Sequence, residues 1–293
     1  MKTTTLGRLF ENTFEEEKQR KNKMPLWADL LLIVLFFVVA SGGADCLAWA
    51  ITDEPFRQTG EYWLLYISLM ALSLSLVILL LHCLIDRRPL RELGMSASGP
   101  WGKYMRIGIG WTFALFVIGF GICWLSGSVS VISVQVNWKD LLLSLLAFFL
   151  GAFYEEILLR GYLLTRLCRT RLNVWASLII SSAIFSALHL ANQGISFLAL
   201  IELFLSGITF GLMFLFTKNL WFPVIAHCAW NWIQGPVFGF KVSGTDMFSS
   251  LITQSITRPN LINGAQFGFE GSIVCIVLEI TFIVLLVKVF RKE

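Results

Sequence analysis

Eight separate stretches of about 20 mostly apolar residues constrain the fold of this chain more than any other feature. They cover approximately residues 26–51, 62–85, 104–125, 141–163, 174–190, 195–216, 220–237 and 272–287. A helix needs about 20 apolar residues to cross the hydrocarbon core of a bilayer. The stretches therefore predict an all-α polytopic membrane protein of about eight transmembrane helices, of which the fifth and the seventh are short.

The composition agrees with lipid as the solvent of this chain. Hydrophobic residues make up 56% of the sequence and charged residues 14%, whereas a soluble domain carries about 25% charged residues. No basic stripe of the kind that binds nucleic acid is present, so the expected partner is the lipid bilayer. The six cysteines are scattered without a C-x-x-C pair, and we interpret them as small buried hydrophobic residues.

The basic residues are distributed unevenly between the two sides of the predicted membrane domain. Of the 23 lysines and arginines, only Arg57, Lys139, Lys241 and Arg258 fall on one side. Cytoplasmic loops carry an excess of basic residues, which predicts that both termini are cytoplasmic and agrees with an even number of spans. The short loops and compact size favour a bacterial cell membrane over the endoplasmic reticulum.

We expect a single transmembrane helical domain over residues 26–290, with a catalytic core at about 140–236. Residues 1–25 precede it as a cytoplasmic tail or surface helix. In that segment charged residues alternate with scattered apolar ones, a pattern compatible with an amphipathic helix and with a solvated tail. The longest outer loop, at about 238–271, is rich in Gly, Ser, Thr and Asn and supports no structural prediction.

Three polar motifs interrupt the apolar stretches: E-E-x-x-x-R at 155–160, F-x-x-x-H at 185–189 and H-x-x-x-N at 227–231. A charged side chain at the centre of a membrane helix costs about 2.5–3.5 kcal/mol on insertion scales. Glu156 and Arg160 lie four residues apart on one helix face, so they can pair. Glu155 points to a different face and needs a partner from another helix, for which the histidines are the obvious candidates.

Helix geometry places these residues at similar depths in the bilayer. At about 1.5 Å of rise per residue, Glu155 and Asn231 each lie roughly 16 Å from the cytoplasmic boundary. His227 lies roughly 10 Å and His189 roughly 22 Å from the same boundary. A lone histidine in a helix is usually a packing residue, but several polar residues that converge at one depth favour a catalytic centre.

The residue types at this depth of the bilayer suit the hydrolysis of an amide bond. A carboxylate and a histidine in a dry pocket can hold and deprotonate a water molecule. A second histidine and an asparagine amide can donate hydrogen bonds to the oxyanion that develops on a carbonyl. No covalent nucleophile is evident, so the pattern predicts attack by an activated water.

The three motifs, in this order and each on its own helix, resemble those of the CPBP family, also called the Abi family, of CAAX-prenyl endopeptidases and bacteriocin-processing enzymes. The resemblance covers about a quarter of the chain, at residues 155–231. It implies an intramembrane endopeptidase of the glutamate type. In that mechanism Glu155 and His189 activate water, His227 and Asn231 form the oxyanion site, and Glu156 and Arg160 form a supporting ion pair.

The same resemblance leaves two possibilities for a cofactor. Two histidines and a glutamate, here His189, His227 and Glu155, can coordinate zinc. We expect no cofactor, because H-E-x-x-H is absent and Asn231 is a poor zinc ligand but a good hydrogen-bond donor. The expected substrate is a hydrophobic peptide or membrane protein, lipidated or not, and prenylated C-terminal peptides, bacteriocin leader peptides and anchored membrane proteins all fit.

Other functions fit the sequence less well. The motifs of site-2-type, presenilin-type and rhomboid proteases are absent. A proton-coupled transporter would use membrane-embedded carboxylates such as Glu202 and Glu279, but no inverted repeat of the transporter type is evident. A non-enzymatic immunity or scaffold protein of the same fold is the third alternative, and the complete motif set argues against it.

Overall fold

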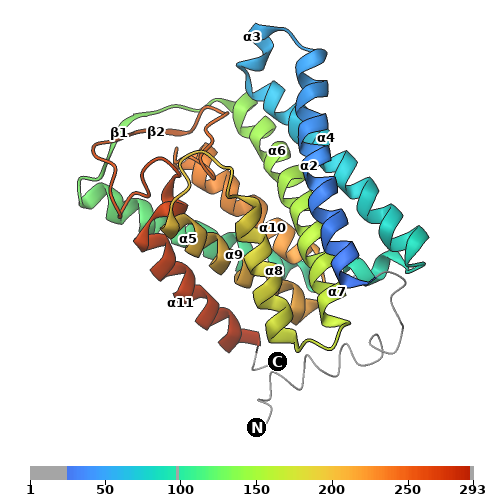
Figure 1. Ribbon diagram of the computed structural model, residues 1–293. Helices are drawn as coiled ribbons and strands as arrows, with labels where there is room; N and C mark the ends of the chain where they lie inside the picture. Colours follow the sequence, from blue (N-terminus) through green and yellow to red (C-terminus); the bar gives the residue numbers. More distant parts are fainter. Residues whose placement is uncertain (1–24, 97–98, 291–293) are drawn as a thin grey trace.

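The computed structural model describes residues 25–96 and 99–290, so the predicted tail or surface helix at the N-terminus lies outside the described residues except for Pro25 (Figure 1). All eight predicted apolar stretches form helices within the described part, which confirms the all-α membrane fold. They are α2 (Leu26–Ala50), α4 (Gly60–Leu79), α5 (Trp101–Leu125), α6 (Trp138–Glu156), α8 (Val174–Leu188), α9 (Phe197–Thr217), α10 (Trp221–Trp232) and α11 (Ile273–Phe290).

Six helical segments among the described residues are long and apolar enough to cross a membrane: Leu26–Ala50, Gly60–Ile85, Gly102–Leu125, Trp138–Cys168, Phe197–Thr217 and Ile273–Phe290. The helices α8 and α10 are shorter, with 15 and 12 residues, as predicted for the fifth and seventh stretches. Large apolar side chains on the outer helix faces are exposed, among them Val38, Leu142 and Val277. A bilayer is the medium in which such surfaces are stable.

Three helices widen into π-helical turns at their C-terminal ends. These are η1 (Leu80–Ile85) after α4, η3 (Ile157–Leu164) after α6 and η4 (Ile233–Val237) after α10. π-turns are frequent at functional sites, and η3 begins directly after Glu156 and carries Arg160. The shorter connecting elements are α3 (Glu54–Arg57), η2 (Leu90–Leu93), α7 (Thr165–Cys168) and η5 (Phe269–Gly271).

A small antiparallel sheet, which the sequence does not predict, joins two outer loops. It consists of β1 (Val129–Val134) and β2 (Ile252–Ile256), with Val129 opposite Ile256 and an irregularity in register between Val131 and Ser133. Strand β2 belongs to the long loop at about 238–271, so this loop has a defined structure.

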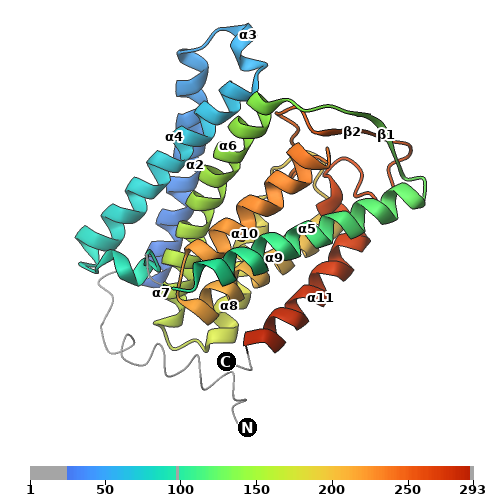
Figure 2. The same ribbon diagram turned by 180° about the vertical axis from the view of Figure 1, so that it is seen from behind.

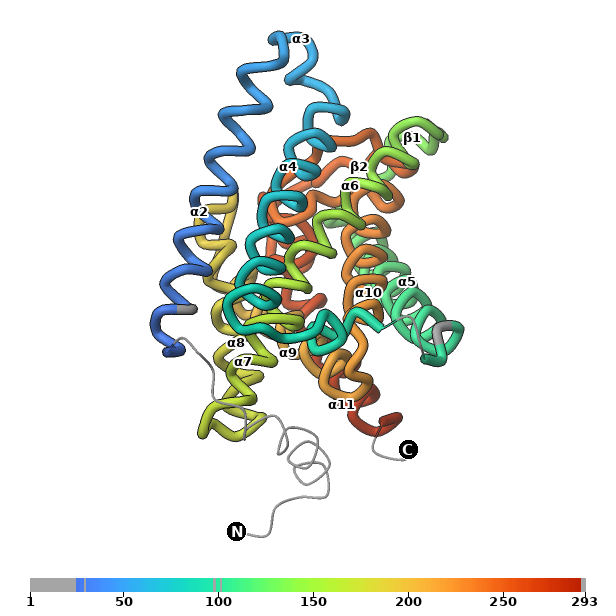
Figure 3. Tube along the Cα trace, turned by 90° about the vertical axis from the view of Figure 1, so that its right-hand side faces the viewer, coloured from blue at the N-terminus to red at the C-terminus, as the bar shows by residue number. Residues whose placement is uncertain are grey.

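The helices that carry the three motifs lie around a shared centre. Helix α6 packs on α4 and α10, and α9 packs on α8, α10 and α11. Figures 1 and 2 show α2 and α4 on one side of this group and α5 and α11 on the other, and Figure 3 shows α2 at the margin of the bundle. The start of α2 and the end of α11 lie at the same end of the bundle, as an even number of passes requires.

Side-chain caps set where three of the helices around the shared centre begin. The N-cap side chain accepts a hydrogen bond from a backbone N–H in the first turn, a contact that stabilises a helix start by about 1 kcal/mol. The pairs are Asn137 with Asp140 for α6, Asn173 with Ala176 for α8 and Ser196 with Ala199 for α9.

Helices α8 and α9 approach closely at Gly207. A Cβ atom at this position would lie 2.8 Å from the Cα atom of Ser182. We expect Gly207→Ala to lower the free energy of unfolding by about 1–3 kcal/mol through overpacking, measured as a lower thermal midpoint in detergent. Gly110→Ala on α5 is the matched control, because its Cβ meets nothing within 4 Å. Equal midpoints for the two variants would contradict the prediction.

Candidate active site

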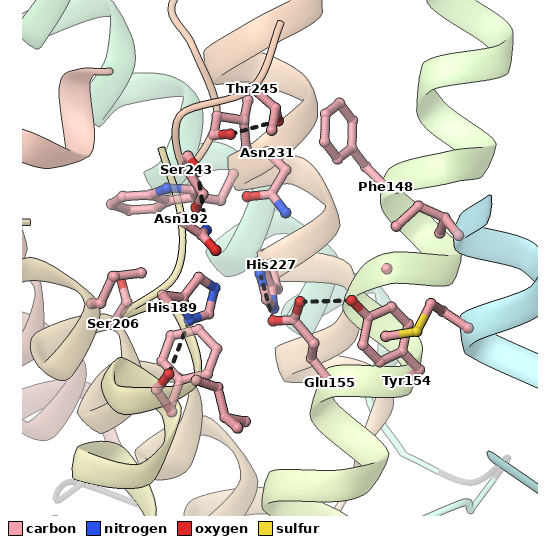
Figure 4. Close-up of a pocket in the computed structure, with 18 of the residues that line it drawn as sticks. Phe148, Tyr154, Glu155, His189, Asn192, Ser206, His227, Asn231, Ser243 and Thr245 are labelled. Atoms are coloured by element: carbon pink, nitrogen blue, oxygen red, sulfur yellow. Dashed lines mark hydrogen bonds and ion pairs between the residues drawn. The ribbon is translucent and has the colours of Figure 1, made fainter. Parts of the chain in front are cut away.

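The four residues predicted as catalytic line one cavity. It has a volume of about 320 Å³, and Glu155 from α6, His189 at the end of α8, and His227 and Asn231 from α10 all contribute to its wall. Figure 4 shows their side chains around the same space. The tertiary structure thus brings together groups that are up to 76 positions apart in the chain.

Glu155 faces His227 across this cavity. The distance between Glu155 Oε2 and His227 Nε2 is 3.9 Å, and the two side chains are 20% and 7% exposed. The other carboxylate oxygen, Oε1, accepts a hydrogen bond of 3.3 Å from the Tyr154 hydroxyl. Oε2 has no hydrogen-bond partner in the described part of the chain. At this separation one water molecule can hydrogen-bond to both Oε2 and Nε2.

The orientation of His189 is set by its own helix. Its Nδ1 lies 2.9 Å from the carbonyl oxygen of Phe185, and a carbonyl only accepts, so Nδ1 carries the proton. Nε2 of the neutral ring is then an acceptor. No direct hydrogen bond between Glu155 and His189 is present in the described structure. The histidine in ion-pair range of Glu155 is therefore His227, although the resemblance pairs Glu155 with His189.

A buried chain of contacts holds His227. Its Nδ1 lies 2.9 Å from Glu156 Oε1, and the same oxygen accepts a hydrogen bond of 2.9 Å from Arg160 Nη1. Glu156 and Arg160 are both almost completely buried. A carboxylate on one ring nitrogen fixes the orientation of an imidazole and leaves the other nitrogen for chemistry. Glu156 therefore contacts both Arg160, its ion-pair partner, and His227 in the cavity wall.

Two phenylalanine rings pack against the side chains of Arg160, His189 and His227. The Phe185 ring lies 4.7 Å from the Arg160 guanidinium and 4.9 Å from the His189 ring. The Phe210 ring on α9 stacks on His227 at 4.7 Å with an interplanar angle of 15°. Such contacts restrict both rings and the cation. Phe185 belongs to a motif, but Phe210 is one of several phenylalanines in α9, and no sequence pattern singles it out.

The outer loop completes the cavity wall. The Asn192 side-chain amide donates to the Ser243 carbonyl at 3.1 Å, and the Ser243 backbone N–H donates to Glu270 Oε2 at 2.9 Å. Glu270 Oε1 accepts from Trp230 Nε1 on α10 at 3.0 Å. The Asn231 amide, which also faces the cavity, has no hydrogen-bond partner among the described residues. Its amide N–H groups are therefore available for hydrogen bonds within the cavity.

The zinc alternative would use His189, His227 and Glu155 as ligands. Within residues 25–96 and 99–290, no group of three His, Cys, Asp or Glu side chains is placed to hold a metal ion. The carboxylates suggested for a transporter, Glu202 and Glu279, are fully buried outside the cavity wall. Glu202 accepts a hydrogen bond from Ser206, and Glu279 accepts one from Thr209.

Comparisons with known proteins agree with the three motifs. A family model described as Rce1-like, type II CAAX prenyl endopeptidase, matches residues 137–233, which is about a third of the chain and contains every motif. No curated protein and no solved structure matches the chain. The matched family is a family of proteases, and the apolar helices are those of an integral membrane protein. Over residues 137–233 the chain thus matches a family of CAAX-type proteases, and this match supports its membership of the CPBP family.

Proposed function

We propose that this protein is an intramembrane endopeptidase that uses an activated water to hydrolyse a peptide bond within, or near the C-terminus of, a membrane-associated polypeptide. One observation carries the proposal. Glu155 Oε2 and His227 Nε2 face the same cavity at 3.9 Å, and Glu156 and Arg160 hold His227 from behind.

The proposed reaction begins with a water held by Glu155. The water oxygen bonds to the scissile carbonyl carbon while one of its protons passes to the Glu155 carboxylate. The other O–H group of the water donates a hydrogen bond to His189 Nε2. Negative charge then develops on the carbonyl oxygen, where the His227 ring and the Asn231 amide donate hydrogen bonds. When the tetrahedral intermediate collapses, the C–N bond breaks and the proton on Glu155 passes to the leaving amine.

The cavity wall suits an apolar polypeptide. Aromatic side chains from α2, α4 and α6 also line it, namely Phe37, Trp63, Tyr66 and Phe148. A peptide segment with apolar side chains, or one with a lipid attached, would bury them against these rings. We further propose that the protein acts in a bacterial cell membrane, with the bilayer and such a polypeptide as its partners.

The proposal is tested by a comparison of new N-termini in membranes. Membranes that contain the protein are compared by mass spectrometry with membranes that contain the Glu155→Gln variant at equal abundance. Peptides with new N-termini that depend on Glu155 would support an endopeptidase. Identical sets of N-termini would overturn the proposal and favour a non-enzymatic scaffold or a transporter.

We also propose that the reaction needs no metal ion. The positions of the histidines and carboxylates support this, because no three of the described ones converge on a common ligand site. Cleavage is expected to continue at an unchanged rate after prolonged treatment with EDTA and 1,10-phenanthroline, and elemental analysis should find zinc well below one atom per chain. One tightly bound zinc whose removal stops cleavage would contradict this expectation.

A further inference from the structure

The two ends of the helical bundle differ in charge. At one end, here called the basic end, α2 begins and α11 ends (Figure 1). Its described basic residues are Arg87, Arg88, Arg91, Lys103, Arg106, Arg166, Arg169, Arg171, Lys218 and Lys288. The opposite end has only Arg57, Lys139, Lys241 and Arg258 among the described residues, together with Asp53, Glu54, Glu61, Asp140 and Asp246. The positive-inside rule assigns the basic end to the cytoplasm.

The catalytic groups are closed off from the basic end. Between them and that end lies η3, whose residues are all buried. Beyond η3, Arg166 pairs with Asp86 at 3.6 Å, and Glu92 accepts from Arg169 at 2.7 Å and from Arg88 at 3.0 Å. Arg166 and Arg169 have side chains only 2% exposed. A polypeptide that entered along the bundle from the basic end would have to break this buried network to reach Glu155.

The cavity instead extends toward the opposite end. Its polar wall continues from His189 through Asn192 and Gln193, after α8, to Thr245 in the outer loop. There it meets a second cavity of about 340 Å³, which shares Trp63, Phe148, Val242 and Thr245 with the first and is otherwise lined by residues of the segment 235–254. Figure 4 shows Thr245 and Asn231 on the side of the site away from Tyr154.

We propose that the substrate reaches this site from the extracytoplasmic face of the membrane. The substrate class is then an exported or membrane-anchored polypeptide with an apolar segment, whose scissile bond enters the cavity from the outer half of the bilayer or from just outside it. A prenylated C-terminus that is presented from the cytoplasm would meet the closed basic end of the bundle and not the open side of the cavity. This inference rests on the proposed endopeptidase function for the cleavage itself, but the direction of access rests on the cavity and on the charge difference between the two ends.

The direction of access can be measured with single cysteines. In a chain whose six native cysteines are replaced by alanine, Gly151→Cys places a thiol in the cavity one turn from Glu155, and Gly102→Cys places one at the basic end. A Cβ atom at either glycine meets nothing within 4 Å, so the two changes are sterically matched. Spheroplasts are treated with the membrane-impermeant reagent MTSET, and unreacted thiols are then counted by a PEG-maleimide gel shift.

We expect MTSET to block Gly151→Cys in intact spheroplasts and to block Gly102→Cys only after permeabilisation. Modification of Gly102→Cys in intact spheroplasts would reverse the orientation and overturn the proposal. Protection of both thiols until permeabilisation would also overturn it. Ala191→Cys, at an exposed position of the same cavity wall, repeats the measurement if Gly151→Cys fails to fold, as judged by size-exclusion chromatography.

The positions of Glu155-dependent cleavage sites provide a second measurement. They should fall in extracytoplasmic segments or in the outer halves of membrane spans. Cleavage sites confined to cytoplasmic segments would overturn the direction of access but leave the endopeptidase function standing. An absence of Glu155-dependent sites together with outward labelling of Gly151→Cys would reject the endopeptidase function and retain the outward-facing cavity.

Discussion

Glu155→Gln is expected to lower kcat/KM for peptide-bond hydrolysis by about 10²–10⁴-fold, the contribution typical of a general base. Glutamine has the same shape and can still accept the hydrogen bond of 3.3 Å from Tyr154, so the cavity should keep its form. The amide cannot take a proton from water, and the loss should therefore appear in kcat. Initial rates in proteoliposomes, with a substrate found from the new N-termini, provide the measurement.

The matched control for this variant is Glu202→Gln. Glu202 is also a buried carboxyl on a membrane helix, but it lies outside the cavity wall and accepts a hydrogen bond of 2.9 Å from Ser206. A glutamine there can accept the same bond, so cleavage should change little. Full activity of Glu155→Gln would remove Glu155 from the reaction.

Glu156→Gln is expected to harm both stability and turnover. The change leaves the buried Arg160 guanidinium without a charged partner, which typically costs about 3–5 kcal/mol of folding free energy. It also removes the carboxylate charge from His227 Nδ1, which lies 2.9 Å from Glu156 Oε1. We expect a lower thermal midpoint together with a lower kcat, measured on purified protein in detergent and in proteoliposomes.

A double variant separates the two roles of Glu156. Glu156→Gln combined with Arg160→Met removes both charges of the buried pair, so much of the lost stability should return. The activity should stay low, because His227 still lacks its carboxylate. A normal thermal midpoint with no turnover in Glu156→Gln would instead place Glu156 in direct contact with the substrate. Recovery of turnover in the double variant would show that Glu156 acts through stability alone.

The sequence determines most of the architecture because lipid imposes simple requirements. A backbone in hydrocarbon must satisfy its own hydrogen bonds, so each of the eight apolar stretches becomes a helix, the short fifth and seventh included. Burying a charge in the membrane is costly, and this cost identifies Glu155, Glu156 and Arg160 as candidate functional residues. Their spacing alone predicts that Glu156 and Arg160 can pair, since residues four apart share a helix face.

Only the tertiary structure decides which side chains meet across helices. Helix periodicity gives depth and face within one helix, but the rotation of α10 against α6 sets the distance of 3.9 Å between Glu155 and His227. It also decides that Glu156 contacts His227 and that Phe210 stacks on it. The outer loop illustrates the same limit, because Ser243 and Glu270 complete the cavity through contacts between distant segments. No local sequence pattern encodes such contacts, since they depend on how separate helices pack against one another.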